Sequence, residues 1–472
     1  MLALSRYSQS MQVPVFLTCA TDNSLSRWSG HWYPFNPREY RGMAFDPQAW
    51  KDEDGMYYIA VATDGWCVRA CVCMRDHCVV VPSPSPQSIR LLARSNSTTR
   101  KVPCVDGMSI YLWRAPRLLA ASTEWESLGP MFNTRDDAMI KNTSRGEMVT
   151  PSFTGRIAGD PLGGRTRLLT NNVCAGTSYY LGTQANGSHF LDRRGGWAFD
   201  GVCEQGMIDW GAVVVNETAV ALGRTGTQAL ATAQQMVPGT CHAPYSMPRV
   251  LGDPSGQTVA TTGRRIMIGW VGNGTFAAQS LPRELSLSPD GCLRQRWVPE
   301  LRALRVPGAI GGGLQLELSA TLTVAPGKAD AGRRRFGVRV LVGPSGEGTD
   351  IGVDLDTDIV YVDGRDSGSC DAVPWQCPNP RAATGTGLYP AGPLLGDPSV
   401  ITLHCYVDAV YVSCIFNNQT AITAMVAPSA QALDPVKSFG SGATIQVNTW
   451  RLAMPGSLAE DLPDSWSRVG IH

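Results

Sequence analysis

The segment 263–305 places the strongest constraint on the fold, because short apolar strands and a tight turn follow one another there. Arg264–Trp270 is an apolar run flanked by charge and followed by glycines, which predicts a buried strand that ends in a turn. Leu281–Leu287 alternates, the sequence Ser-Pro-Asp-Gly at 288–291 predicts a tight turn, and Cys292–Trp297 is the returning strand. The segment therefore predicts an antiparallel β-hairpin next to a buried strand.

Composition extends this prediction to the whole chain of 472 residues, which contains 50 glycines and 32 prolines. Short apolar runs separated by turn residues dominate, and long apolar patterns of helical period are scarce. The sequence therefore predicts an all-β protein, and its length is sufficient for two or three domains. No apolar stretch reaches the roughly 18 to 20 residues that a membrane-spanning helix needs, so we expect no membrane partner.

The charge balance excludes another class of partner. Lysine and arginine together number 40, as do aspartate and glutamate, so the formal net charge is zero. A nucleic-acid-binding protein or a protein that docks on anionic lipid usually carries an excess of positive charge. We therefore expect neither nucleic acid nor a membrane surface as a partner.

The opening segment also resembles a known sequence pattern. Its runs GRRIMIGW, SLPREL, DG and VPELRALR resemble the closing propeller blade of glycoside hydrolase family 32, the invertases and fructan hydrolases. This resemblance implies a five-bladed β-propeller followed by a C-terminal β-sandwich. It also implies retaining hydrolysis of β-fructosides such as sucrose or fructans, with a small carbohydrate as partner and with neither cofactor nor metal.

The domain organisation follows from the same resemblance and from composition. We expect a glycosidase-like propeller over 1–305, a linker over 306–313 and a β-sandwich over 314–472. The linker is predicted as a flexible hinge because its sequence, PGAIGGG, is rich in glycine. Beyond it, short alternating runs predict the strands of a sandwich. These predicted strands are Leu314–Val324, Arg335–Leu341, Ile351–Leu355, Ile359–Val362, Val400–Val407 and Ala409–Phe416.

Asp46 is the first candidate for the active site. It precedes Pro47 at the start of a predicted strand, and the upstream run SLSRWSGHWYPFNP resembles the end of the family's second blade. This order implies the position of the family's Arg-Asp-Pro aspartate, which hydrogen-bonds sugar hydroxyls in the transition state, although Phe45 replaces the arginine. The alternative is an Asp-Pro turn that only begins a strand.

The nucleophile that the resemblance implies has no counterpart. In the family it is an aspartate in an Asn-Asp-Pro motif of the first blade, and this tripeptide does not occur in the sequence. We therefore expect a propeller whose N-terminal blade is missing, from either an incomplete sequence or an inactive protein. The resemblance then leaves an alternative, which is a non-catalytic carbohydrate-binding descendant of the family.

Glu147 and Asp209 complete the candidate site. Glu147 lies in the run GEMVTPSF, two residues before Val149, where the resemblance places the family's acid/base glutamate. Two residues along a strand return to the same face, so a small local shift would restore its position; otherwise it is an exposed glutamate beside Arg145. Asp209 lies in a predicted Asp-Trp-Gly turn, where it either lines the substrate pocket or caps the turn.

An insertion over 64–109 is rich in cysteine, serine and proline. A zinc site is conceivable, but the spacing of its first four cysteines lacks a C-x2-C pair and a matching second half. Disulfides or free thiols are the preferred interpretation, and no metal is expected. Those cysteines are Cys67, Cys71, Cys73 and Cys78.

Fourteen cysteines and six Asn-x-Ser/Thr sequons suggest a secretory route, and so an extracellular or vacuolar location. The N-terminal sequence carries only one early arginine and interrupts its apolar runs with serine and glutamine, which does not resemble a signal peptide. The sequons lie at Asn96, Asn142, Asn186, Asn216, Asn273 and Asn418.

Overall fold

The protein is described by a computed structural model, most completely from 265 to 453. The described residues are 2–5, 15–18, 44–51, 55–63, 66–67, 71–74, 77–80, 102–103, 109–117, 124–133, 152–154, 159, 166–173, 176–183, 205–209, 214–216, 249–253, 265–272, 277–289, 291–325, 334–368 and 388–453.

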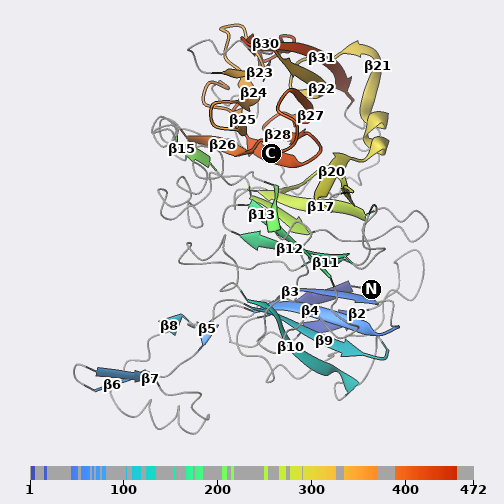
Figure 1. Cartoon of the computed structure of the whole chain (residues 1–472), viewed down its shortest axis with the longest axis vertical. Coiled ribbons are helices and arrows are strands. Elements are labelled where there is room, and N and C mark those ends of the chain that lie inside the picture. The colour runs from blue at the N-terminus through green and yellow to red at the C-terminus, as the bar shows by residue number, and fades with distance from the viewer. Residues whose placement is uncertain are drawn as a thin grey trace, which may run out of the picture. The chain divides into compact units, whose positions relative to one another are not determined.

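Nearly all regular structure in these residues is antiparallel β-sheet, which confirms the predicted all-β class (Figure 1). The short 3-10 helix η3 (Pro299–Leu304) begins with a proline, whose fixed backbone angle suits the first turn of a helix. Among the described residues no helix has the length and apolar character required to cross a membrane. The chain divides into two compact units, Met1–Val173 with Tyr179–Gly206, and Cys174–Ser178 with Met207–His472.

The first unit contains a four-stranded sheet in which each strand pairs with its neighbour in the sheet order β10-β9-β4-β3. Gly55, shortly before β4, has a positive φ of 80°, a conformation that glycine adopts readily. Tyr58, Ile59 and Trp113 supply buried side chains. The strands are β3 (Ala44–Lys51), β4 (Tyr57–Thr63), β9 (Ser109–Ala115) and β10 (Glu126–Asn133), and β1 (Leu2–Ser5) pairs separately with β2 (Val15–Thr18).

The cysteine-rich segment lies between two strands of this sheet. Strands β4 and β9 are direct neighbours, with Tyr57 opposite Ala115, and the insertion itself stays a prediction. Within the insertion, Cys73 and Cys78 are register partners in a two-stranded hairpin. Its short strands are β5 (Trp66–Cys67), β6 (Cys71–Met74), β7 (His77–Val80) and β8 (Val102–Pro103).

Two further sheets repeat the same up-and-down order. One has the order β11-β12-β13-β14, and the other has the order β16-β17-β19-β20 with β18 beside β17. The first comprises β11 (Ser152–Thr154), β12 (Thr166–Val173), β13 (Gly176–Thr183) and β14 (Gln205–Asp209). The second comprises β16 (Arg249–Asp253), β17 (Arg265–Gly272), β18 (Ala277–Gln279), β19 (Arg283–Leu287) and β20 (Leu293–Trp297).

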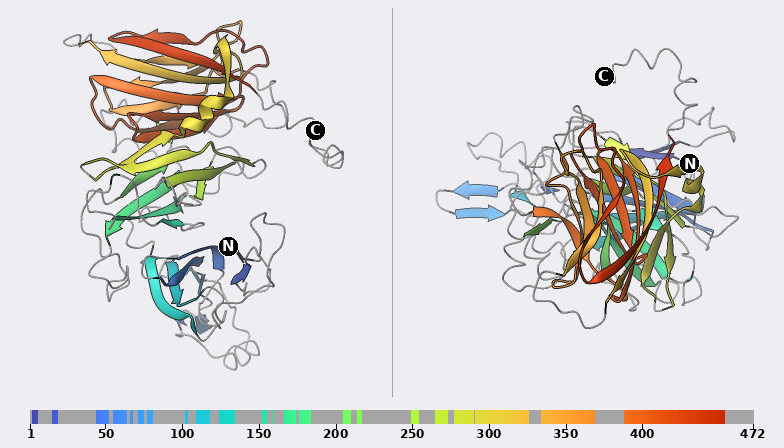
Figure 2. Two further views of the ribbon diagram at one scale, coloured as in Figure 1. Left: turned by 90° about the vertical axis from the view of Figure 1, so that its right-hand side faces the viewer. Right: turned by 90° about the horizontal axis from the view of Figure 1, so that it is seen from above.

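The C-terminal part of the second unit is built from two six-stranded antiparallel sheets, drawn from yellow to red in Figure 2 apart from β15. One has the order β15-β26-β25-β24-β23-β30, with β15 (Val214–Asn216), β26 (Leu388–Pro393), β25 (Ile359–Asp363), β24 (Thr349–Asp354), β23 (Arg335–Val340) and β30 (Lys437–Gly440). The other has the order β21-β31-β22-β27-β28-β29, with β21 (Arg305–Ile310), β31 (Ala443–Leu452), β22 (Gln315–Val324), β27 (Val400–Asp408), β28 (Tyr411–Phe416) and β29 (Thr420–Met425).

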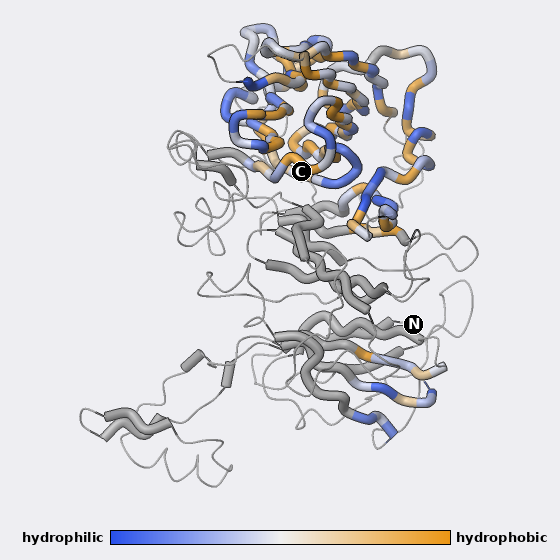
Figure 3. Tube along the Cα trace, in the orientation of Figure 1, coloured by the Kyte–Doolittle hydropathy of each residue, from blue (hydrophilic) through white to orange (hydrophobic). Residues whose placement is uncertain are grey.

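Alternation of apolar side chains explains why these segments form strands. Along β22, Leu316, Leu318, Ala320 and Leu322 occupy every second position, and each is at most 2% exposed. A period of two directs such side chains to one face of a sheet. Figure 3 shows hydrophobic and hydrophilic stretches alternating through both C-terminal sheets. The predicted strands of this part are confirmed to within two residues at each end.

The prediction of a flexible hinge at 306–313 is wrong. Residues Arg305–Ile310 form β21, which pairs with β31 at the edge of a six-stranded sheet. A Cβ atom on Gly311 would lie 2.7 Å from the backbone nitrogen of Trp450, so that glycine permits close contact with β31. The domain boundary predicted here stays a prediction, and these residues lie within the second unit.

A disulfide joins Cys405 of β27 to Cys414 of β28, which face each other across the two strands. Replacing both with serine is expected to lower the free energy of unfolding by about 2 to 3 kcal/mol, because the bridge restricts the unfolded chain. Urea denaturation of the variant and of the wild type, each with and without reductant, measures this. Equal stability of the oxidised and reduced wild type would contradict the expectation.

Candidate functional site

The hairpin formed by β19 and β20 has two distinct faces. Its turn is closed by a hydrogen bond from Gly291 N–H to the Ser288 carbonyl oxygen (2.7 Å), and Gly291 has a φ of 79°. These features confirm the predicted turn. Register pairs alternate between the faces of the hairpin, so Ser286 with Arg294 lies on one face and Leu285 with Gln295 lies on the other. The first face is polar and the second is buried.

The buried face contains an arginine, Arg283, which is only 1% exposed. Its Nη1 donates to Oε1 of Gln295 (3.2 Å) and its Nη2 donates to Oγ1 of Thr423 in β29 (3.0 Å). The guanidinium also lies over the ring of Trp297, 5.1 Å from its centre. Gln295 continues the connection, because its Nε2 donates to the Gln419 carbonyl oxygen (2.7 Å). A polar network therefore fastens the hairpin to the C-terminal sheet.

Trp297 is the apolar centre of the same junction. Its ring packs edge-on against Tyr406, with the ring centres 5.3 Å apart, and its Nε1 donates to the His404 carbonyl oxygen (3.0 Å). Ile415 and Ala421 belong to the same buried cluster. The hairpin and the sheet β21-β31-β22-β27-β28-β29 are thus held together by both apolar and polar contacts.

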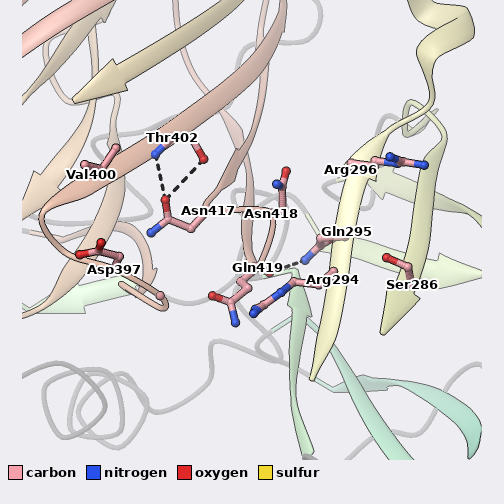
Figure 4. Close-up of a pocket in the computed structure, with 11 residues that line it drawn as sticks. Ser286, Arg294, Gln295, Arg296, Asp397, Val400, Thr402, Asn417, Asn418 and Gln419 are labelled. Carbon is pink, nitrogen blue, oxygen red and sulfur yellow. Dashed lines mark hydrogen bonds between the residues drawn. The ribbon is translucent and has the colours of Figure 1, made fainter. Parts of the chain in front are cut away.

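A pocket of about 470 Å³ opens beside this junction, between β20 and two turns of the C-terminal sheets (Figure 4). Arg294 and Gln419 lie at its centre, Asp397 and Val400 on one side, and Ser286 on the other. Figure 4 also places Arg296, Thr402, Asn417 and Asn418 around it.

Asn417 holds the two turns in place. Its Oδ1 accepts a hydrogen bond from the Thr402 N–H (2.8 Å), and its Nδ2 donates to the Leu395 carbonyl oxygen (2.8 Å). Asn417 and Asn418 have positive φ angles of 49° and 54°, a conformation that asparagine tolerates better than most residues. Gly396 has a φ of 88° and leaves room for the amides of Asn417 and Gln419.

The electrostatics of the pocket are mixed. Arg296 pairs with Glu284 across the hairpin (3.2 Å). Hydrogen bonds from the hydroxyl and N–H groups of Ser399 lower the pKa of Asp397, which is therefore ionised at neutral pH. Nη1 of Arg294 is buried and has no hydrogen-bond partner in the described part of the chain. The pocket thus offers both donors and acceptors but gathers a single carboxylate from the described residues, whereas retaining glycosidases use two.

A second polar cluster surrounds Glu317 of β22, whose side chain is fully buried. Arg305 donates to both carboxylate oxygens (2.6 and 2.7 Å), and Nε2 of His404 lies 2.8 Å from one of them. Burial alone raises the pKa of Glu317, but the hydrogen bonds from Arg305 and His404 outweigh it and lower the pKa to about 2. Arg305 also stacks over Trp450, 3.7 Å from the ring centre. This cluster fastens β21 to the sheet.

Comparison with known proteins identifies the fold. Fructan 1-exohydrolase IIa from Cichorium intybus matches with a TM-score of 0.57 and 14% identity, covering 95% of this chain and 80% of its own. A variant of that enzyme solved with 1-kestose matches with the same TM-score and 15% identity over 95% and 81% of the two chains. A fructosyltransferase from A. japonicus matches with a TM-score of 0.54 and 14% identity over 94% and 79%.

The chain has the fructan exohydrolase fold. The sequence resemblance to glycoside hydrolase family 32 is thereby confirmed at the level of the fold. No protein-family model and no curated protein sequence matches the chain. At identities of this size, a shared fold by itself assigns no activity.

Within the fructan exohydrolase fold, the predicted site residues are only partly located. Asp46 lies in β3, inside a shift of the β3–β4 register between Phe45 and Gln48. Asp209 is the last residue of β14. The side chains of both, and all of Glu147, lie outside the described residues. Asp46 belongs to the first compact unit and Asp209 to the second.

The pocket could not be recognised from sequence, because its residues come from distant segments. Arg294 and Gln419 both occur in runs that predict strands or turns, and neither belongs to a recognisable binding motif. The burial of Arg283, in contrast, could have been recognised from the sequence. It lies on the same face of the strand as the buried Leu285 and Leu287, and a charged residue at such a position predicts a buried polar partner.

Proposed function

We propose that the protein is a glycoside hydrolase that acts on the O-glycosyl bonds of β-fructosides, sucrose or fructans, by a retaining mechanism. One combination of observations carries the proposal: the family 32 motifs in the sequence occur in a chain with the fructan exohydrolase fold over 95% of its length. Neither observation alone would suffice, since the motifs lie mostly in structural segments and a fold hosts many activities.

The proposed architecture is a propeller of the five-bladed type followed by a β-sandwich. Two four-stranded sheets and one sheet of four strands with β18 added beside β17 support the propeller, because a propeller blade has four strands in up-and-down order. Two six-stranded antiparallel sheets support the sandwich predicted over 314–472, since all their strands except β15 and β21 lie in that range.

In the proposed mechanism, Asp46 hydrogen-bonds the sugar hydroxyls as positive charge develops on the ring. Glu147 protonates the leaving-group oxygen while a carboxylate nucleophile, for which this sequence offers no candidate, bonds to the anomeric carbon. Glu147 then activates the water that displaces that carboxylate, and Asp209 lines the substrate pocket. The register shift at Asp46 supports this assignment, since β-bulges, a common cause of such shifts, are frequent next to active sites. Phe45, in place of the family's arginine, would leave Asp46 without one orienting partner.

Replacing Asp46 with asparagine tests the proposal. We expect kcat/KM for fructose release from sucrose or inulin to fall about 100- to 1,000-fold, the usual cost of losing one electrostatic stabiliser of a transition state. Asp434→Asn is the matched control, because Asp434 is an exposed aspartate whose ion pair within the described residues is with exposed Lys437. Full activity in the Asp46→Asn variant would contradict the assigned role.

The alternative proposal is a non-catalytic carbohydrate-binding protein. Phe45 and Val149, which stand where the family has catalytic side chains, favour it. The purified protein would then bind 1-kestose without releasing fructose. Release of fructose that depends on Asp46 and Glu147 would exclude this alternative.

A secretory location, extracellular or vacuolar, is also proposed. The disulfide between Cys405 and Cys414 supports it, since such bonds persist in oxidising compartments.

A further inference from the structure

The pocket beside the junction is suited to bind a ligand of its own. We propose that it is a non-catalytic binding site for a neutral saccharide chain. The inference deepens the proposed function and rests on it for the choice of carbohydrate as the ligand class. The pocket itself is argued from its own hydrogen-bonding groups, its charge and its rim.

The hydrogen-bonding groups at the centre of the pocket lack partners. Nη1 of Arg294 is shielded from solvent and makes no hydrogen bond within the described residues. A buried donor of this kind costs free energy unless a ligand or water satisfies it. The side-chain amides of Asn418 and Gln419 also line the pocket and are not engaged with other described residues. Asp397 adds a carboxylate acceptor.

This combination fits sugar hydroxyls better than an anion. Each hydroxyl both donates and accepts, so it can use the Arg294 donor together with the Asp397 acceptor. The charges in the pocket also balance, because Arg296 is paired with Glu284 and the charge of Arg294 is offset by that of Asp397. A phosphate or carboxylate ligand would meet the Asp397 carboxylate at close range.

The rim supplies the apolar contact that the carbon-bound hydrogens of a sugar ring require. Leu395 and Val400 are 43% and 44% exposed, and they are two of the three large hydrophobic side chains that are exposed in the described part of the chain. Val400 lines the pocket, and Leu395 precedes its glycine, Gly396. The volume of about 470 Å³ lies within the roughly 300–1,000 Å³ usual for small-molecule sites.

Hydrogen exchange measured by mass spectrometry tests the proposal at the pocket itself. The full chain is labelled with and without 1-kestose, and separately with maltotriose, which distinguishes fructosyl from glucosyl chains. At a sugar concentration about ten times Kd, exchange of the turns at 394–402 and 417–419 is expected to slow by up to about tenfold. The measurement is repeated with the Asp46→Asn variant, in which consumption of 1-kestose is expected to be about 100- to 1,000-fold slower.

Two pocket variants and one control locate the effect. Arg294→Ala and Gln419→Ala are each expected to abolish the slowing, whereas Arg302→Ala, an exposed arginine of η3 outside the pocket, is expected to retain it. Slowing by either sugar that is lost in both pocket variants supports the site. Thermal unfolding near the wild-type temperature shows that each variant is folded.

Three outcomes would overturn the proposal. They are the absence of slowing with both sugars, slowing that persists in the two pocket variants, and slowing by inorganic phosphate but by neither sugar. The test is separate from that of the proposed activity, because it measures hydrogen exchange in the two turns and not fructose release. A chain that releases no fructose but shows the slowing would retain this site and lose the hydrolase assignment.

Discussion

Replacing Glu317 with glutamine is expected to lower the free energy of unfolding by about 3 to 5 kcal/mol, the usual cost of breaking a buried ion pair by removing one partner. The variant leaves Arg305 beside a neutral amide and weakens the contact with His404. Urea denaturation followed by tryptophan fluorescence measures the change, since Trp297 and Trp450 lie close to the cluster.

Asp350→Asn is the matched control for Glu317→Gln. Asp350 forms the same bidentate pair with Arg339 (2.6 and 2.8 Å), but both side chains are partly exposed. Solvent weakens such pairs to about 1 kcal/mol or less. An equal decrease in the free energy of unfolding in the two variants would show that the burial of Glu317 does not strengthen its ion pair.

The same residue predicts how stability depends on pH. The pKa of Glu317 is lowered to about 2 in the folded protein, so in the acid range the unfolded chain binds more protons and stability rises with pH. The contribution, on the order of 3 kcal/mol, is complete above pH 4.5 and is lost as the pH falls from 4.5 towards 2. A variant without the carboxylate should lose stability less steeply in this window.

Replacing Trp297 with alanine is expected to destabilise the second unit by about 3 to 5 kcal/mol, the range for large aromatic side chains in cores. The substitution removes the edge-on contact with Tyr406, the hydrogen bond to the His404 carbonyl and the surface beneath Arg283. Thermal and urea denaturation measure the loss.

Trp297→Phe separates the two causes. It keeps most of the apolar contact but leaves the His404 carbonyl without its indole donor, so a smaller cost of about 1 to 3 kcal/mol is expected. A change within error for Trp297→Ala would mean that the junction between the hairpin and the C-terminal sheet contributes little to stability.

The strands of the C-terminal part could be predicted from sequence because their information is local. The alternation of apolar and polar residues along Gln315–Val324 and Val400–Asp408 indicates which side chains face inward. The Ser-Pro-Asp-Gly turn sets the register of the hairpin formed by β19 and β20. The error at 306–313 had a physical cause. Glycines occur both in flexible linkers and where two backbones approach closely. At 306–313 the closeness of β31 shows that the second reason applies.

The binding pocket could not be predicted, because it depends on contacts between distant residues. Gln295 and Gln419 are separated by 124 positions in the chain, and their hydrogen bond brings Arg294 against the turn after β28. Asp46 and Asp209 became candidates only through the resemblance to a family. Their neighbours in sequence, a proline and a tryptophan, would suit an ordinary strand or turn equally well.

The buried arginine of the SLPREL motif has a consequence for how the molecule can be divided. A chain divided near 305 would remove the hydrogen bond from Arg283 to the Thr423 hydroxyl and expose the indole of Trp297. Each half would then present to solvent groups that are buried in the intact protein. Any chimera that exchanged the C-terminal half would have to import a hydroxyl at 423 and a carbonyl at 419 in the same positions. The SLPREL motif therefore forms part of the contact between the hairpin and the C-terminal sheet. It can be transferred to another protein only together with that sheet.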